Sequence, residues 1–191
     1  AEGAVASLTD AALVLTTPYA GTLTIPRDRL VRLTVQEPGL RLVIDPSSHH
    51  LGNEIPTSPP FLDPPFPEGG ELERHFEVPP DAAGSAFMTL DVLGVVGEAA
   101  GLPFSEFIRR GELKTYLAID GRRIDDLNRF VDSPNETVLR IRVPIPADLV
   151  RPGRHVLRIE QTGSAEDPHE FDDLGVLGVA VEFAAPIIPR P

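Results

Sequence analysis

Cysteine and tryptophan are absent from this sequence of 191 residues, and tyrosine occurs only twice. The lack of cysteine excludes disulfide bonds, thiolate catalysis and cysteine-ligated zinc sites. No apolar run approaches the roughly 18 residues that a membrane-spanning helix needs, so we expect no such helix. Because the chain starts at Ala1, we expect a processed protein or an excised segment. Its localisation stays open, with a secreted or cell-envelope protein slightly favoured.

Basic residues are also few, with 17 Lys and Arg against 29 Asp and Glu and a formal net charge of -12. An acidic surface repels phosphate groups, which argues against nucleic-acid binding and against adsorption to anionic membranes. Lys114 is the only lysine, and the arginines are scattered along the chain. We interpret this preference for arginine as the coding bias of a GC-rich bacterium.

Long helices are disfavoured by 21 prolines, because a proline inside a helix costs about 3 kcal/mol. Between them lie short runs in which apolar residues alternate with polar ones, as in strands with one buried face. The runs are residues 12–16, 22–25, 30–35, 40–44, 71–78, 86–96, 113–120, 137–145, 155–160 and 176–183. They predict an all-β fold, a jelly-roll β-sandwich of two antiparallel sheets that takes in residues 1–191 as one domain.

Several details follow from this interpretation. We expect the N-terminal runs to continue the same sheet, and residues 86–96 to form a central strand because they are apolar on both faces. Residues 103–110 predict a short helix that has Ser105 as its N-cap and ends at Gly111, and residues 124–130 predict a second helical turn. The predicted core consists of Leu90, Val92, Leu117, Ile119, Leu139, Ile141, Val143, Leu157, Ile159, Leu177, Val179, Val181 and Phe183.

Residues 46–70 interrupt the alternation with a high density of prolines. Since proline donates no backbone hydrogen bond, we expect a long surface loop outside the sheets, held against the sandwich by Phe61 and Phe66. His49 and His50 lie in this segment. Adjacent residues of an extended chain point in opposite directions, so we interpret the two histidines as solvent-exposed and not as ligands of one metal.

Three segments resemble the galactose-binding-domain-like superfamily, the jelly-roll sandwiches that occur as carbohydrate-binding modules and as accessory domains of glycosidases. Residues 143–159 read as a strand, a short turn that ends in glycine, and a second strand. Residues 171–183 place acidic residues before a closing apolar strand, and residues 116–121 end a strand in Asp-Gly. The resemblance implies a sandwich that binds carbohydrate. Sugar-binding members generally stack sugar rings on Trp or Tyr, and this chain offers only Tyr19 and Tyr116.

Two polar segments are candidate sites. The connection at residues 120–129 gathers side chains of the kinds that bind sugar hydroxyl groups, and equally the residue types of an ordinary charged turn. Its candidate ligand-binding residues are Asp120, Arg122, Asp125, Asp126 and Asn128. The acidic run at residues 166–173 could supply oxygen ligands to calcium, and the resemblance implies a structural calcium ion near the last strand. The candidate metal ligands are Glu170, Asp172 and Asp173, with a solvated acidic loop as the alternative.

No catalytic constellation is recognisable: Gly-x-Ser-x-Gly and a phosphate-binding glycine loop are both absent. The first hypothesis is therefore a non-catalytic carbohydrate-binding-like module of a bacterial protein. The alternative is a structural or assembly domain that binds another protein through a sheet face or through residues 61–66. A hydrolase is kept as a third alternative. No cofactor is established by the sequence, and a structural calcium ion is the candidate.

Overall fold

The structure is a computed structural model that describes residues 4–17, 21–30, 39–82, 84–101, 103–132 and 137–184. The chain divides into two compact units, Ala1–Gln36 and Glu37–Pro191, which we describe separately. No helix among the described residues has the length and apolar character needed to cross a membrane. The prediction that residues 1–191 form a single domain stays a prediction.

The first unit contains a three-stranded antiparallel sheet in the order β1-β2-β3, formed by Ala4–Leu8, Ala12–Thr17 and Gly21–Pro26. A short 3-10 helix follows at Arg27–Arg29. Both strands predicted here exist, but the expectation that they continue the sheets of the sandwich was wrong. Strand β2 pairs with β1 on one side and with β3 on the other, and this sheet is separate from the other two. Most of the run predicted at residues 30–35 lies outside the described residues.

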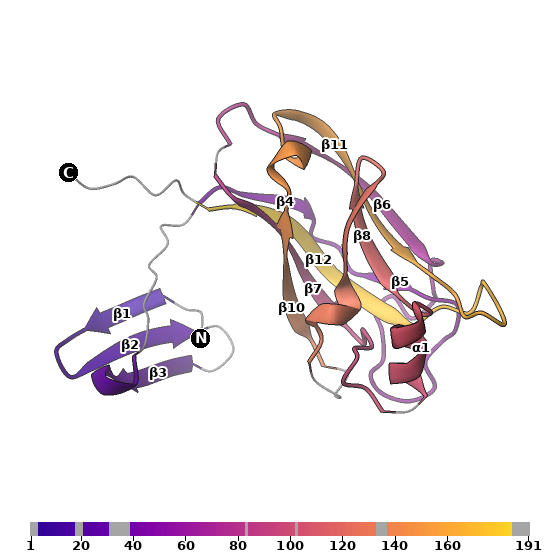
Figure 1. Cartoon of the computed structure of the whole chain (residues 1–191), viewed down its shortest axis with the longest axis horizontal. Helices are drawn as coiled ribbons and strands as arrows, with labels where there is room; N and C mark the ends of the chain where they lie inside the picture. Colours follow the sequence, from indigo (N-terminus) through magenta and orange to yellow (C-terminus); the bar gives the residue numbers. More distant parts are fainter. Residues whose placement is uncertain are drawn as a thin grey trace. The chain divides into compact units, whose positions relative to one another are not determined.

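The second unit is an all-β sandwich of two antiparallel sheets, which confirms the predicted fold class (Figure 1). The five-stranded sheet has the order β10-β7-β12-β4, with β5 also paired to β12. Its strands are β4 (Arg41–Asp45), β5 (His49–Leu51), β7 (Ala86–Leu93), β10 (Leu139–Ile145) and β12 (Leu174–Phe183). The four-stranded sheet has the order β6-β11-β8-β9. Its strands are β6 (Glu71–Val78), β8 (Thr115–Ile119), β9 (Arg122–Asp126) and β11 (Gly153–Gln161).

The core lies between these two sheets, where the inward-facing residues of each strand alternate with outward-facing ones. All of the predicted core residues are buried except Leu139 and Leu177, which are partly exposed. Leu177 differs because the pairing of β12 with β7 shifts between Val176 and Gly178, and this bulge leaves Leu177 out of the alternation. The predicted central position of residues 86–96 is confirmed, since β7 lies between β10 and β12.

The helical segments agree in part with the prediction. Helix α1 spans Phe104–Arg110 and ends at Gly111, whose φ of 83° is a left-handed conformation that favours glycine. Its N-cap position is Pro103, and Ser105 is a buried residue inside the helix. The predicted turn at residues 124–130 is β9 followed by a 3-10 helix at Leu127–Phe130. A further 3-10 helix occupies Ala147–Leu149.

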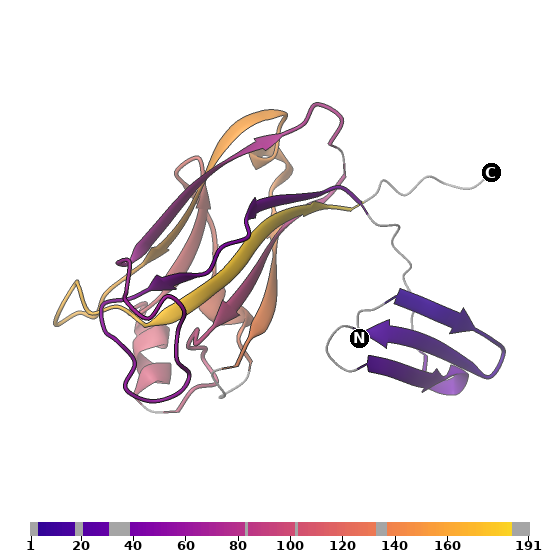
Figure 2. The same cartoon turned by 180° about the vertical axis from the view of Figure 1, so that it is seen from behind.

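One end of the sandwich collects α1, strand β5 and the connections that precede β6 and β12. Figure 2 shows the same end of the sandwich from behind. Hydrogen bonds tie these connections together: the Phe171 amide donates to Asn53 Oδ1 at 2.8 Å, and the Gln161 amide donates to the carbonyl oxygen of Gly70 at 2.8 Å. We call this the loop end of the sandwich.

Candidate functional site

The first candidate site, the β8–β9 hairpin, is held by contacts within the fold. Asp120 occupies the turn with a φ of 51°. Its carboxylate accepts a hydrogen bond from the Val156 amide at 2.9 Å and lies 2.8 Å from Nδ1 of the buried His155. The pKa of Asp120 is lowered: burial opposes the shift, but the hydrogen bonds from Val156 and His155 outweigh it. Asp120 therefore fixes the turn of the hairpin.

His155 is the partner that makes this turn sensitive to pH. Its other ring nitrogen, Nε2, lies 2.6 Å from the carbonyl oxygen of Arg151, so both ring nitrogens face acceptors. Burial opposes protonation, but the Arg151 carbonyl and the Asp120 carboxylate raise the pKa of His155 above its usual value. Two acceptors at this spacing favour the imidazolium, which can donate from both nitrogens at once.

The other predicted ligand residues are also engaged within the hairpin and its neighbours. Arg122 Nη1 donates to Asp148 at 2.6 Å. Arg129 donates to Asp125 at 2.9 Å, and Lys114 donates to Asp126 at 3.0 Å.

Asn128 is the residue for which the structure departs most from the predicted role. It has no exposed surface. Its amide nitrogen donates to the carbonyl oxygen of Val96 at 2.8 Å, and its Oδ1 accepts from the Thr115 amide at 2.8 Å. A side chain with no exposed surface and with both ends of its amide bonded holds the fold together and does not reach a ligand.

Tyr116 offers little stacking surface. The ring of Tyr116 is covered by Arg123, whose Cζ lies 3.9 Å from the ring centroid, and Arg123 is held there by Glu160 at 2.6 Å. Tyr19 lies outside the described residues.

The second candidate site, the acidic run before β12, is used for hydrogen bonds between loops. Asp173 Oδ1 accepts from the amides of Asn53 and Glu54, both at 3.0 Å. Asp172 Oδ2 accepts from the Val96 amide at 3.2 Å, and Glu170 accepts from Ser164 Oγ at 2.7 Å.

The three predicted metal ligands thus form hydrogen bonds with different residues and share no partner among the bonds described above. Among the described residues there is no group of three or more His, Cys, Asp or Glu side chains that could hold a metal ion. Calcium binding by Glu170, Asp172 and Asp173 stays a prediction.

The two histidines at the base of the long loop are buried, and the expectation that they are exposed was wrong. His49 and His50 form β5, which pairs with β12, so residues 46–70 do contribute a strand to the sheet. His50 has no exposed surface; its Nδ1 lies 3.2 Å from the carbonyl oxygen of Pro65 and its Nε2 lies 3.3 Å from Asp173 Oδ1. The sequence did not indicate this strand because it has only three residues, too few to show an alternation, and a proline-rich segment follows it.

His49 lies in a compact cluster of charged groups. Its Nδ1 lies 2.8 Å from Glu68 Oε2, and its Nε2 lies 3.0 Å from Asp45 Oδ2 and 2.8 Å from Arg74 Nη2. Arg74 Nε also donates to Asp45. Burial would raise the pKa of Asp45, but hydrogen bonds from Arg74, Ser47 and His49 outweigh it and lower the pKa to about 2. The bond from His49 to Glu68 joins the two ends of the loop.

Residues 52–67, which we name the aromatic loop, are closed at their base and fastened at their middle. The Gly52 amide donates to the carbonyl oxygen of Gly69 at 3.0 Å, and the Glu68 amide donates to that of His50 at 2.8 Å. Leu62 is 6% exposed and packs over β12, where its Cδ2 would lie 3.3 Å from a Cβ added at Gly175. The residue that holds the loop is therefore Leu62, and the expectation that the phenylalanines do so was wrong.

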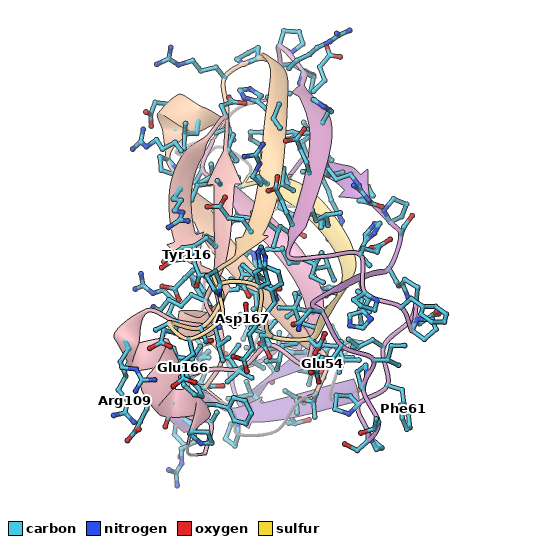
Figure 3. All side chains as sticks on the ribbon, turned by 90° about the vertical axis from the view of Figure 1, so that its right-hand side faces the viewer. Glu54, Phe61, Arg109, Tyr116, Glu166 and Asp167 are labelled. Atoms are coloured by element: carbon cyan, nitrogen blue, oxygen red, sulfur yellow. The ribbon has the colours of Figure 1, made fainter. Side chains whose placement is uncertain are left out.

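Phe61 and Phe66 instead point their rings into solvent, with exposed fractions of 65% and 68%. Ile55, in the same loop, is 51% exposed. Figure 3 shows Phe61 at the loop end of the sandwich, with Glu166 and Asp167 of the turn before β12 on the other side of this end and Glu54 between them. The aromatic loop is therefore a fixed support for two exposed phenyl rings beside several carboxylates. In the sequence, the feature that could have indicated this surface is the combination of two phenylalanines with many prolines.

Comparison with known proteins found no family model and no curated protein that matches the sequence. Among solved structures, the chain is similar to a β-porphyranase of glycoside hydrolase family 86 from the human gut bacterium Bacteroides plebeius, with 12% identity and a TM-score of 0.38. It is also similar to BuGH86wt, solved in complex with neoagarooctaose, with 12% identity and a TM-score of 0.43. The matches cover 91% and 98% of this chain but only 26% and 28% of those chains.

A third similar structure is a family 35 carbohydrate-binding module from an environmental isolate. It shows 11% identity and a TM-score of 0.35, and the match covers 74% of this chain and 91% of that one. At these sequence identities and TM-scores, nothing about the ligand of this chain follows from the three matches.

Proposed function

We propose that this chain is a non-catalytic carbohydrate-binding-like module of a bacterial protein and that the aromatic loop is its binding surface. The observation that carries the proposal is the exposure of Phe61 and Phe66 on a loop that is held from beneath. Leu62 and the His50 contact fix the loop between the two rings, so the rings are presented without the ordering cost of a flexible segment.

The chemistry of exposed phenyl rings suits a sugar. Ligand sites combine apolar and aromatic surface with a small number of polar groups that fix orientation. A pyranose ring has one face formed by C–H groups, which can stack on phenyl rings, and a rim of hydroxyl groups. The carboxylates of Glu54 and Glu166 are exposed at the same end of the sandwich and can accept hydrogen bonds from such hydroxyl groups.

The β8–β9 hairpin, which the sequence favoured as the ligand site, is less suited to this role. Its carboxylates and arginines bind one another, Asn128 is buried, and Arg123 covers the ring of Tyr116. A ligand there would have to displace existing ion pairs, whereas the rings of the aromatic loop are already exposed.

Affinity electrophoresis through gels that contain soluble polysaccharides, together with a glycan array, tests the proposal. We expect at least one glycan to retard the chain, and the double variant Phe61→Ala/Phe66→Ala to lose the retardation. Each aromatic contact is worth about 0.5–1.5 kcal/mol, so removing both should weaken binding by about fivefold or more.

Val43→Ala is the matched control, because it removes an apolar side chain that is 60% exposed on β4, away from the aromatic loop. It should leave the retardation unchanged. Binding of no glycan would refute the proposal. If the double variant then also removed self-association in light scattering, the assembly-domain alternative would take its place. Release of reducing ends from a bound glycan would refute the non-catalytic part of the proposal.

A further inference from the structure

The connections at the loop end carry an excess of negative charge. Residues 52–70 and 162–173, which form two of these connections, contain no lysine or arginine, and Arg74 at the base of the aromatic loop is paired with Asp45. The exposed acidic residues of the two segments are Glu54, Asp63, Glu68, Glu166, Asp167 and Glu170. The loop end therefore places two exposed aromatic rings in a negative potential, in a chain whose formal net charge is already -12.

Some of these carboxylates are already used by the fold and others are not. Asp167 Oδ1 accepts from the His169 amide at 2.8 Å, and Glu170 accepts from Ser164. The carboxylates of Glu54, Asp63 and Glu166 form no ion pair or hydrogen bond with any residue in the described part of the chain. They are therefore able to bind a positive group without first breaking a contact.

The arginines of α1 do not neutralise this surface. Arg110 is paired with Glu112 at 2.6 Å, and Arg109 donates to Ser105 Oγ at 3.1 Å. Figure 3 shows Arg109 on the side of Glu166 and Asp167 opposite to Phe61. Phe61 and Arg109 thus lie on opposite sides of the loop end.

From this charge distribution, and resting on the proposed function above, we propose that the aromatic loop selects glycans that carry free amino groups. A protonated amino group is attracted to the face of an aromatic ring by the electrostatic field of the ring. The same group forms charge-assisted hydrogen bonds with carboxylates, which are stronger than neutral ones. Sulfated and uronic-acid polymers would be repelled by the same carboxylates.

A matched pair of ligands isolates the charge. Soluble chitosan oligosaccharides and the same oligosaccharides after complete N-acetylation share their backbone and differ in whether the nitrogen is charged. Titration calorimetry should give binding of the amino form at least about tenfold tighter than that of the acetylated form, which corresponds to about 1.4 kcal/mol. Binding of the amino form should also weaken as salt rises from about 20 to about 500 mM, because salt screens exposed charges.

Variants separate the site from the overall charge of the chain. Glu54→Gln and Asp63→Asn should each weaken binding of the amino form by about two- to fivefold, as expected for exposed ion pairs, and leave the acetylated form unaffected. Glu77→Gln removes an exposed carboxylate of β6 and is the control. Phe61→Ala/Phe66→Ala should weaken both forms.

The outcomes distinguish the two proposals. If no glycan binds, the proposed function fails and this inference fails with it. If glycans bind, but the acetylated or a uronic-acid polymer binds as tightly as the amino form, only the inference is overturned. An equal loss with Glu77→Gln would show attraction to the whole acidic protein, and would also overturn it.

Discussion

Several carboxylates in this protein hold backbone segments in place. Asp173 accepts hydrogen bonds from two amides of the aromatic loop, Asp120 accepts one from Val156, and Asp126 accepts one from Arg129 at 3.1 Å. All three residues were candidate ligands on the basis of the sequence. A sequence shows that an oxygen is available, but only the fold shows whether a backbone amide already uses it. The individual site residues were therefore the least predictable part of the molecule.

The contact of His155 with Asp120 gives a prediction for the dependence of stability on pH. The pKa of His155 is raised in the folded state, so the contact stabilises the fold fully below the unfolded value of about 6.5 and is lost as pH rises through the folded pKa. We expect the free energy of unfolding, measured with urea, to fall between about pH 6 and about pH 9.

His155→Gln should remove most of this dependence on pH. His75→Gln is the control, because the side chain of His75 is 78% exposed and its contact with Glu73 is long, at 3.8 Å. A wild-type stability that stays constant from pH 6 to pH 9 would contradict the account, as would an equal effect of the two substitutions. NMR titration of the His155 ring gives its pKa directly.

At the scale of elements, most strands were predictable because alternation of apolar and polar residues reports a face of a sheet. Residues 139–145 and 153–161 form strands close to where the alternation placed them. The alternation failed at Leu177, where one extra residue in β12 shifts the pairing. It also failed at β5, which is too short for a pattern. Both failures lie beside Gly175, where Leu62 of the aromatic loop packs.

Leu62 is the element-scale test of how the aromatic loop is held. Leu62→Ala should remove its packing over β12 and let the loop open locally. We expect hydrogen exchange of the Gly52 and Glu68 amides to accelerate, while the amides of β7 remain protected. The loss in global stability should stay below the approximately 2–5 kcal/mol typical of a core Leu→Ala substitution.

Phe61→Ala is the comparison for this variant, since it removes a side chain that is 65% exposed and should leave the exchange of both amides unchanged. Unchanged protection of Gly52 and Glu68 in Leu62→Ala would mean that the histidine contacts alone fix the loop. Unfolding of the whole sandwich would mean that the loop is part of its core.

At the scale of the whole molecule, the sequence predicted the fold class and the character of the surface. An all-β sandwich follows from strand patterns that are repeated many times, so an error in one strand does not change the result. The N-terminal strands show the limit of this inference: Leu13 and Leu15 are buried as an alternating strand predicts. Nothing in their pattern says that they pair into a separate sheet, because a strand's composition does not specify its partner.

The position of the binding surface was the other whole-molecule property that sequence alone did not predict. A sequence does not show whether a phenylalanine is exposed or packs against the sheet. Here Phe61 and Phe66 are exposed because Leu62 is the loop residue that packs over β12. The candidate ligand site chosen from the sequence was the polar hairpin at residues 120–129. The exposed aromatic surface instead lies in a different segment, at residues 52–67.

The most direct test of the account is to map the bound glycan on the protein by NMR. Titration of the labelled chain with a glycan that it binds should shift the amide signals of residues 53–68 and 164–170, together with the ring signals of Phe61 and Phe66. Signals of the hairpin at residues 120–129 should stay in place. Shifts confined to that hairpin, with the signals of the aromatic loop unchanged, would contradict the account.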